Sequence, residues 1–151
     1  MPAYHYKECG LDNVMVEGIP CQDDDGDEVV TIHNIAGLHH TIAEAIVAHK
    51  AGISGKELRF LRTEMGMTQA ELAKVVHHDT QSIGRWERGE IPIEPNADAI
   101  IRLLAVERLN LSNGTDSVEG LSGRCVPTAA PQQILIDGHD PTHYRALELA
   151  A

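Results

Sequence analysis

The sequence has few aromatic residues, few cysteines and few basic residues. Phe, Trp and Tyr make up 3% of the 151 residues, and Lys and Arg number 12 against 23 Asp and Glu. The three cysteines (Cys9, Cys21 and Cys125) are scattered and odd in number, which argues against a disulfide framework. No apolar run approaches the length of a membrane span, and we expect neither a signal peptide nor a membrane anchor. A cytoplasmic protein is the simplest interpretation.

The motifs of common enzyme classes are also missing. The chain has no glycine-rich phosphate loop, no nucleophile elbow and no metal-protease helix. His77 and His78 stand beside Asp79, but adjacent residues on a turn point in different directions, and no nucleophile accompanies them. We therefore expect a protein that is not an enzyme and that has no cofactor.

Charge is distributed unevenly along the chain. Residues 1–53 hold 2 basic and 9 acidic side chains, residues 54–92 hold 6 and 6, and residues 93–151 hold 4 and 8. The net charge of −11 is wrong for a simple basic DNA-binding protein, but the central segment is neutral. Acidic flanks should weaken non-specific binding to DNA, so a DNA-binding protein of this kind would depend on base contacts and dimer geometry.

Two short helices joined by a tight turn are predicted in the neutral segment. Thr68 and Glu71 have the spacing of a capping box, so one helix begins at about Gln69. Asp79 is a good N-cap for a second helix, in which Ile83 and Trp86 share a face and should pack inward. Gly89 would end that helix.

Further helices should flank this pair. Ser54 and Glu57 form another capping box, opening a helix with Leu58, Leu61 and Met65 at helical spacing. Pro95 begins a helix rich in isoleucine and leucine. Each helix is too short to be stable alone, so residues 54–111 should form one helix-turn-helix domain of four or five helices.

These residues resemble the Xre and Cro family of DNA-binding domains, the phage-repressor type. The resemblance rests on the Thr-Gln-x-Glu-Leu-Ala run from Thr68 and the Ile-x-x-Trp-Glu-x-Gly ending from Ile83. It implies that Gln69 contacts phosphate, that Thr80, Gln81 and Arg85 face bases, and that Ser82 and Arg88 lie near the DNA backbone. The family usually has glycine in the turn where this chain has His77, although His tolerates positive φ better than most residues.

Side-chain chemistry selects the strongest candidates for base contacts. Arg matches the two acceptors of guanine and Gln can pair twice with adenine, each pair contributing roughly 1–3 kcal/mol of discrimination. Arg85 and Gln81 are therefore the best candidates, although most single Arg and Gln residues are merely solvated. The full predicted DNA-binding set is Gln69, Lys74, Asp79, Thr80, Gln81, Ser82, Arg85 and Arg88.

Residues 1–53 predict a small α+β module. Val14–Val16 and Val29–Ile32 are β-prone, with an Asp-Gly turn signal between Asp24 and Asp27. We expect a small antiparallel sheet, with Tyr4–Lys7 as a third strand, followed by a helix from about Leu38 to Gly52. The predicted fold is thus mainly α, a five-helix Xre/Cro-type domain preceded by a β-hairpin-plus-helix module.

This amino-terminal arrangement is similar to that of antitoxins of the MqsA type, in which a zinc module precedes a helix-turn-helix. Those modules use two Cys-x-x-Cys pairs, whereas Cys9 and Cys21 stand alone here, so zinc does not carry over. Cys9, Cys21 and nearby histidines are suitable ligands by type, but residue type alone is a poor predictor of a site. We expect no metal site.

Residues 112–151 are expected to form a linker and a carboxyl-terminal arm. Ser112–Ala130 is rich in small and polar residues, Gln133–Gly138 predicts a strand, and His143–Leu149 predicts one or two helical turns. Such an arm could dock on its own domain, reach a dimer mate or bind a partner protein by strand addition.

Two hypotheses of function follow. The first is a sequence-specific DNA-binding regulator, a repressor acting as a homodimer on a pseudo-palindromic operator in double-stranded DNA. A narrower version makes it the antitoxin of a toxin–antitoxin pair, with a cognate toxin as partner. The alternative is a protein-interaction module that keeps the helix-turn-helix fold with little specific DNA binding.

Overall fold

The computed structural model describes residues 3–19, 21–24, 27–111, 118–127 and 132–147. Six helices and six strands lie in these ranges. The chain folds into two compact units: residues 1–42 with 133–151, and residues 43–132. The carboxyl-terminal residues therefore belong to the same unit as the amino-terminal ones.

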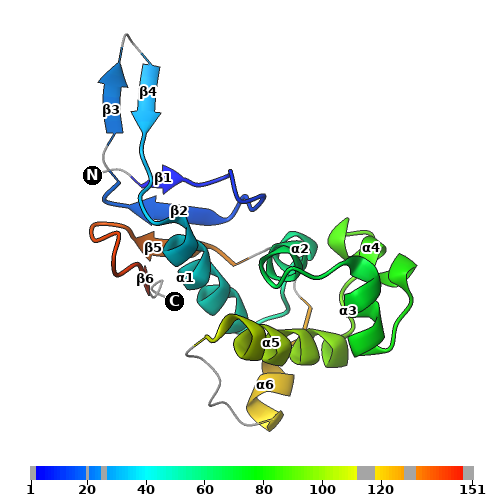
Figure 1. The fold of residues 1–151 in the computed structure, drawn as a ribbon. Coiled ribbons are helices and arrows are strands. Elements are labelled where there is room, and N and C mark those ends of the chain that lie inside the picture. Colours follow the sequence, from blue (N-terminus) through cyan, green and yellow to red (C-terminus); the bar gives the residue numbers. More distant parts are fainter. Residues whose placement is uncertain (1–2, 20, 25–26, 112–117, 128–131, 148–151) are drawn as a thin grey trace. The chain divides into compact units, whose positions relative to one another are not determined.

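The first unit contains a mixed four-stranded sheet, in the order β1 (Tyr4–His5), β2 (Val14–Glu17), β5 (Ile134–Asp137) and β6 (Arg145–Leu147) (Figure 1). β2 pairs antiparallel with β1 and parallel with β5, and β5 pairs antiparallel with β6. In β2 and β5 every second residue is buried, which is the pattern of strands with one face on a core. The strand predicted at Gln133–Gly138 thus docks on its own chain.

Strands lie in all three segments predicted for residues 1–53, although residues 6–7 and 31–32 are not part of them. The predicted pairing was wrong. Instead of pairing with the 29–32 region, β2 lies between β1 and β5, and β4 (Asp27–Val30) pairs with β3 (Cys21–Asp24) as a separate ribbon. A turn signal favours local pairing, whereas the register of Val14 opposite Ile134 joins distant parts of the sequence. Residues 25 and 26 of the predicted turn lie outside the described residues.

Helix α1 (Ile35–Val47) begins directly after Asn34, a residue with φ of 58°. The Asn34 side-chain oxygen accepts a hydrogen bond from Gly37 N at 3.1 Å, which satisfies one of the unpaired donors at the start of the helix. Thr41 Oγ1 donates to Tyr144 O at 3.3 Å and so ties the helix to the segment before β6. The helix ends at Val47, earlier than the end predicted near Gly52.

The second unit contains the predicted helix-turn-helix domain. The helices that begin in this unit are α2 (Gly55–Glu64), α3 (Gln69–Val76), α4 (Thr80–Glu87), α5 (Pro95–Leu109) and α6 (Val118–Arg124) (Figure 1). Both predicted capping boxes are formed, at the start of α2 and of α3. α4 packs on α2 and α3, while α5 packs on α2, α3 and α6. The predicted fold class, a helix-turn-helix domain with a small β-containing module, is confirmed.

A buried ion pair fixes the segment that leads into α2. Arg102 and Asp98 on α5 are each 1% exposed, and Arg102 Nε donates to Asp98 Oδ1 at 2.7 Å. Arg102 also donates to the carbonyl oxygens of His49 at 2.7 Å and Ala51 at 2.6 Å, and Asp98 Oδ2 accepts from Ile53 N. These hydrogen bonds compensate for the cost of burying both charges. They also tie the backbone of residues 49–53, which leads into α2, to α5.

Two predictions for the carboxyl-terminal region were wrong in detail. The stretch predicted as a linker contains α6, in which Leu121 is buried and which packs on α5, because a short helix depends on tertiary contacts for its stability. Residues 112–117 and 128–130 of that stretch lie outside the described residues. The helical turn predicted from His143 is instead strand β6, because pairing with β5 overrides the weak local preference. Leu149 is not described.

Candidate nucleic-acid interface

A surface hollow of ≈ 430 Å³ lies where the first turn of α3 meets the outer face of α4. It is lined by Gln69, Thr80, Gln81, Gly84, Arg85 and Arg88. Five of these six residues belong to the predicted DNA-binding set, and the sixth is a glycine of the same helix face. The fold therefore gathers residue 69 of α3 and one face of residues 80–88 into one polar surface.

The local sequence explains why α4 presents this face. Ile83 and Trp86 are 0% and 3% exposed, and they fix the inner side of the helix. Gln81 and Arg85, four residues apart, are exposed and share the opposite side. Asp79 begins the helix by accepting a hydrogen bond from Ser82 N at 2.6 Å.

A half-buried chain of three side chains fixes Gln69. Arg62 on α2 donates from Nε to Glu87 Oε2 at 2.6 Å and from Nη2 to Glu87 Oε1 at 3.0 Å. Arg62 Nη1 also donates to Met67 O at 2.9 Å, in the segment that leads into α3. Gln69 Nε2 donates to Glu87 Oε1 at 3.1 Å, which sets the direction of its amide at the edge of the hollow. The pairing of Arg62 with Glu87 was not predicted from the sequence, because residues 25 positions apart give no local signal.

The turn between α3 and α4 accommodates histidine where glycine was expected. His77 ends α3 with φ of 59° and ψ of 41°, and its N–H donates to Ala73 O. His78 lies edge-on to Trp86, with ring centroids 4.8 Å apart, and His78 Nε2 is 3.6 Å from Glu94 Oε2. The two helices thus keep a glycine-like turn with a non-glycine residue.

Charges around the hollow are partly paired. Arg88 donates from Nε and Nη2 to the two carboxylate oxygens of Glu90, at 3.2 Å each. This hydrogen-bonded pair lowers the pKa of Glu90 and raises the pKa of Arg88. The hydrogen bonds from Ser82 lower the pKa of Asp79, so the start of α4 carries a carboxylate at neutral pH.

The other three residues of the predicted DNA-binding set do not line the hollow, although they lie near its lining residues in the sequence. Lys74 is exposed on α3, and Asp79 and Ser82 form the cap of α4. Gln69, Thr80, Gln81, Arg85 and Arg88 are brought together by the fold.

The described parts of the chain contain no cluster of metal ligands and no membrane-spanning helix. There, no group of three or more His, Cys, Asp or Glu side chains is arranged to hold a metal ion. Cys9 instead contacts Tyr6 O at 3.7 Å through its sulfur. The helices of residues 35–109 and 118–124 are all too short or too polar to cross a membrane.

Comparison with known families agrees with the geometry. Residues 58–108, about a third of the chain, match the family described as Helix-turn-helix, which is of the Xre/Cro type. This family consists of DNA-binding regulators, which are typically not enzymes. No curated protein and no solved structure matches the chain.

Proposed function

We propose that this protein is a sequence-specific DNA-binding regulator that represses transcription by occupying its operator as a homodimer. The observation that carries the proposal is the hollow in which Gln69 from α3 meets Gln81, Arg85 and Arg88 from α4. Such a surface, on a helix held from behind by Ile83 and Trp86, suits insertion into the major groove. A regulator of this kind would act in the cytoplasm.

The exposed side chains of α4 supply the base contacts in this proposal. Gln81 and Arg85 lie one helical turn apart and can read neighbouring base pairs, adenine and guanine respectively, with Thr80 beside them. Gln69, Ser82, Arg88 and Lys74 would position the domain on phosphates. Asp79 acts through its cap, which presents Ser82 and the first turn of α4 to the DNA backbone.

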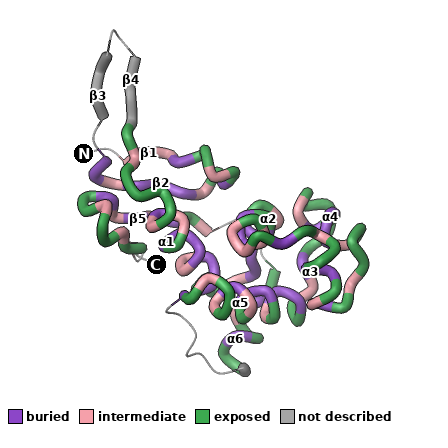
Figure 2. Tube along the Cα trace, viewed as in Figure 1, coloured by how far each residue is buried: buried purple, intermediate pink, exposed green. Residues whose placement is uncertain are grey.

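The exposed face of α5 supplies the dimer contact in this proposal. Figure 2 shows that α5 carries buried, intermediate and exposed positions along its length. Ile101 is fully buried in the core of its own domain, whereas Ile100 and Leu103 are 40% and 49% exposed and lie three residues apart. A helix that is apolar on both sides is typical of one covered on both sides. A second copy would cover Ile100 and Leu103, and binding to a pseudo-palindromic operator would require the two α4 helices of this dimer to lie roughly 34 Å apart.

The antitoxin version extends the same proposal by analogy of architecture. Residues 54–111 would bind DNA, while the amino-terminal module or the carboxyl-terminal arm would engage a cognate toxin. Since β5 and β6 complete the sheet of the first unit, we expect the module and the arm to act together. A small toxin-like reading frame next to the gene would support this version.

Substitution of the proposed contacts tests the regulator proposal. An operator is first selected from a random-sequence DNA library with the full chain. Gln81→Ala and Arg85→Ala should then relax the preference at single base pairs, each by about 1–3 kcal/mol, whereas Lys74→Ala should weaken all sequences alike. If Arg85→Ala lowers the affinity for operator and random DNA equally, Arg85 contacts phosphate and the assignment is wrong.

The net charge of −11 favours one competing function, a protein-interaction module that has kept the fold and lost specific DNA binding. A purified chain that selects no sequence from the random library would support this alternative.

A further inference from the structure

The turn after α4 places an acidic residue against one of the cations of the hollow. Gly89 has φ of 74°, and Glu90 N donates to Arg85 O at 3.0 Å, so the chain folds back onto the last turn of the helix. This turn brings the Glu90 carboxylate within hydrogen-bonding distance of the Arg88 guanidinium. Two hydrogen bonds of 3.2 Å join the two groups in a fork-to-fork arrangement.

A glycine allows Arg88 to lie across the helix. A Cβ added at Gly84 would stand 3.0 Å from Arg88 Nη1, and the other guanidinium atoms near it, Cζ and Nη2, would lie at 3.8 and 3.9 Å. The Arg88 side chain therefore lies over Gly84, inside the hollow that Gln81 and Arg85 also line. Its partner Glu90 consequently holds a negative charge at the edge of that surface.

The pair is too exposed to be explained by fold stability. The side chains of Arg88 and Glu90 are 60% and 52% exposed, and exposed ion pairs contribute little to the free energy of unfolding. The pair does, however, change the charge that an approaching ligand meets at this surface. Carboxylate and phosphate oxygens match the same pairs of guanidinium donors, so Glu90 occupies one of the edges of Arg88, the Nε and Nη2 edge, through which a DNA phosphate could bind.

We infer that Glu90 competes with DNA phosphate for Arg88 and thereby lowers the sequence-independent affinity of this surface. The inference rests on the proposed DNA-binding function and adds a residue that controls it. Before Arg88 can bind a phosphate through Nε and Nη2, the Glu90 pair must open, and the Glu90 charge also repels the DNA backbone. This competition lowers the affinity for every DNA sequence alike, so discrimination between DNA sequences depends on Gln81 and Arg85.

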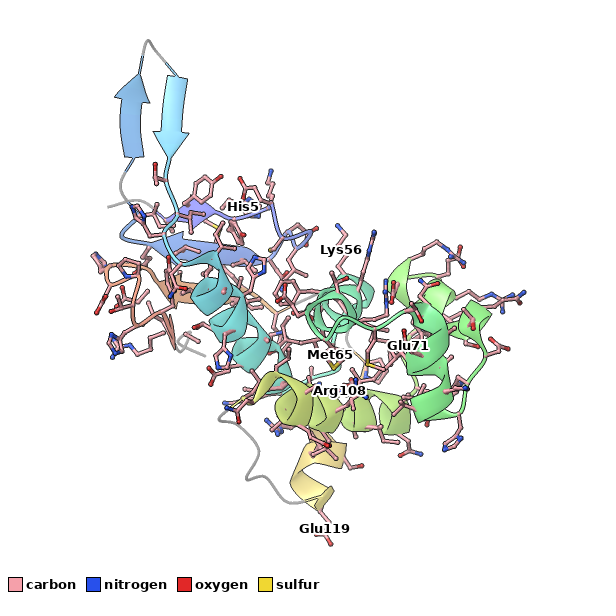
Figure 3. All side chains as sticks on the ribbon, viewed as in Figure 1. His5, Lys56, Met65, Glu71, Arg108 and Glu119 are labelled. Carbon is pink, nitrogen blue, oxygen red and sulfur yellow. The ribbon has the colours of Figure 1, made fainter. Side chains whose placement is uncertain are left out.

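The test compares two isosteric variants of the full chain, Glu90→Gln and Glu119→Gln. Glu119 stands at the start of α6 and points away from α4 (Figure 3), so its loss changes the net charge equally without touching the hollow. Dissociation constants are measured for the selected operator and for random DNA across a series of KCl concentrations. Thermal melting confirms that both variants fold.

Glu90→Gln should tighten binding to operator and random DNA by the same factor, about fivefold, which corresponds to one unit charge acting over about 4 Å in water. It should also steepen the dependence of log K on log salt by about 0.9, since one more phosphate is neutralised. Glu119→Gln should change both quantities much less. In an Arg88→Gln background, Glu90→Gln should no longer steepen the salt dependence.

Three results would overturn the inference. Equal effects of Glu90→Gln and Glu119→Gln would show a general charge effect, and the proposed function would still stand. Weaker operator binding by Glu90→Gln, with unchanged binding to random DNA, would show that Glu90 aims Arg88 at a base. A wild-type chain that binds no DNA would overturn the proposed function together with this inference.

Discussion

At the scale of single residues, His77 adopts a backbone conformation that glycine adopts more easily. Its φ of 59° lies in the left-handed region, which costs a residue with a Cβ roughly 1–2 kcal/mol. His77→Gly should therefore raise the free energy of unfolding by about 0.5–1 kcal/mol, after allowing for the greater entropy of glycine in the unfolded chain. Urea denaturation measures the change.

The matched control for His77 is the end of α5. Asn110 has φ of 54°, but asparagine tolerates this region, so Asn110→Gly should change stability less than His77→Gly does. A decrease in stability for His77→Gly would show that the imidazole makes contacts that outweigh the backbone strain.

Asp79 should make the stability of α4 depend on pH. The hydrogen bonds from Ser82 lower the folded-state pKa of Asp79 below its ordinary value of 3.8. A lowered carboxyl pKa means that the stabilisation is complete well above pH 3.8 and is lost as the pH falls through the folded-state pKa. Asp79→Asn keeps a good N-cap without the charge, so the stability advantage of the wild type over Asp79→Asn should shrink as the pH falls from 6 to about 3. A difference that stays constant over this pH range would contradict the pKa assignment.

The residues that the sequence predicted best are those whose partners are local. The caps at Ser54, Thr68 and Asp79 each bond a backbone N–H three residues ahead, so the spacing alone reveals them. The Arg62–Glu87 pair depends on how α2 meets the end of α4, and the Arg88–Glu90 pair depends on the turn at Gly89. Contacts set by packing or by a turn conformation carry no fixed spacing that could have predicted them.

At the scale of elements, the close approach of α2 to the end of α4 depends on a glycine. A Cβ at Gly55 would lie 2.1 Å from the backbone oxygen of Trp86, which cannot move without moving α4. Gly55→Ala should lower the free energy of unfolding by about 1–3 kcal/mol or more. Gly123→Ala on α6 is the control, because nothing lies within 4 Å of its Cβ position among the described residues and helix propensity favours alanine. Equal stabilities of the two variants would contradict the close packing of α2 on α4.

The elements of the two units were predictable to different degrees. α2 to α5 carry helical periodicity and their own start signals, so their bounds followed closely from the sequence. The sheet was only partly predictable: β1, β2, β4 and β5 were expected as strands, but the pairing of β2 with β5 joins residues far apart in the chain. The register of short strands is set by which face they bury. Local sequence patterns do not show which distant strand will pair with them.

At the scale of the whole molecule, the proposed dimer predicts how the molecular mass in solution changes when the exposed face of α5 is altered. Leu103→Glu places a charge on the exposed face of α5 and should shift the chain from dimer to monomer in sedimentation equilibrium, with little change in the melting temperature. Val126→Glu is the control, since Val126 is also apolar and 59% exposed but lies outside α5. A dimer that survives Leu103→Glu would place the interface elsewhere.

The most direct test of the account is the ratio of affinities for a selected operator and for random DNA. Specific DNA-binding proteins typically exceed a ratio of about a thousand at physiological salt. The helix-turn-helix domain, in which residues 54–92 carry no net charge and Gln81 and Arg85 are exposed, predicts a ratio at least that high, lowered by Arg85→Ala. A ratio below about a hundred for the wild-type chain would contradict the account and favour the protein-interaction module.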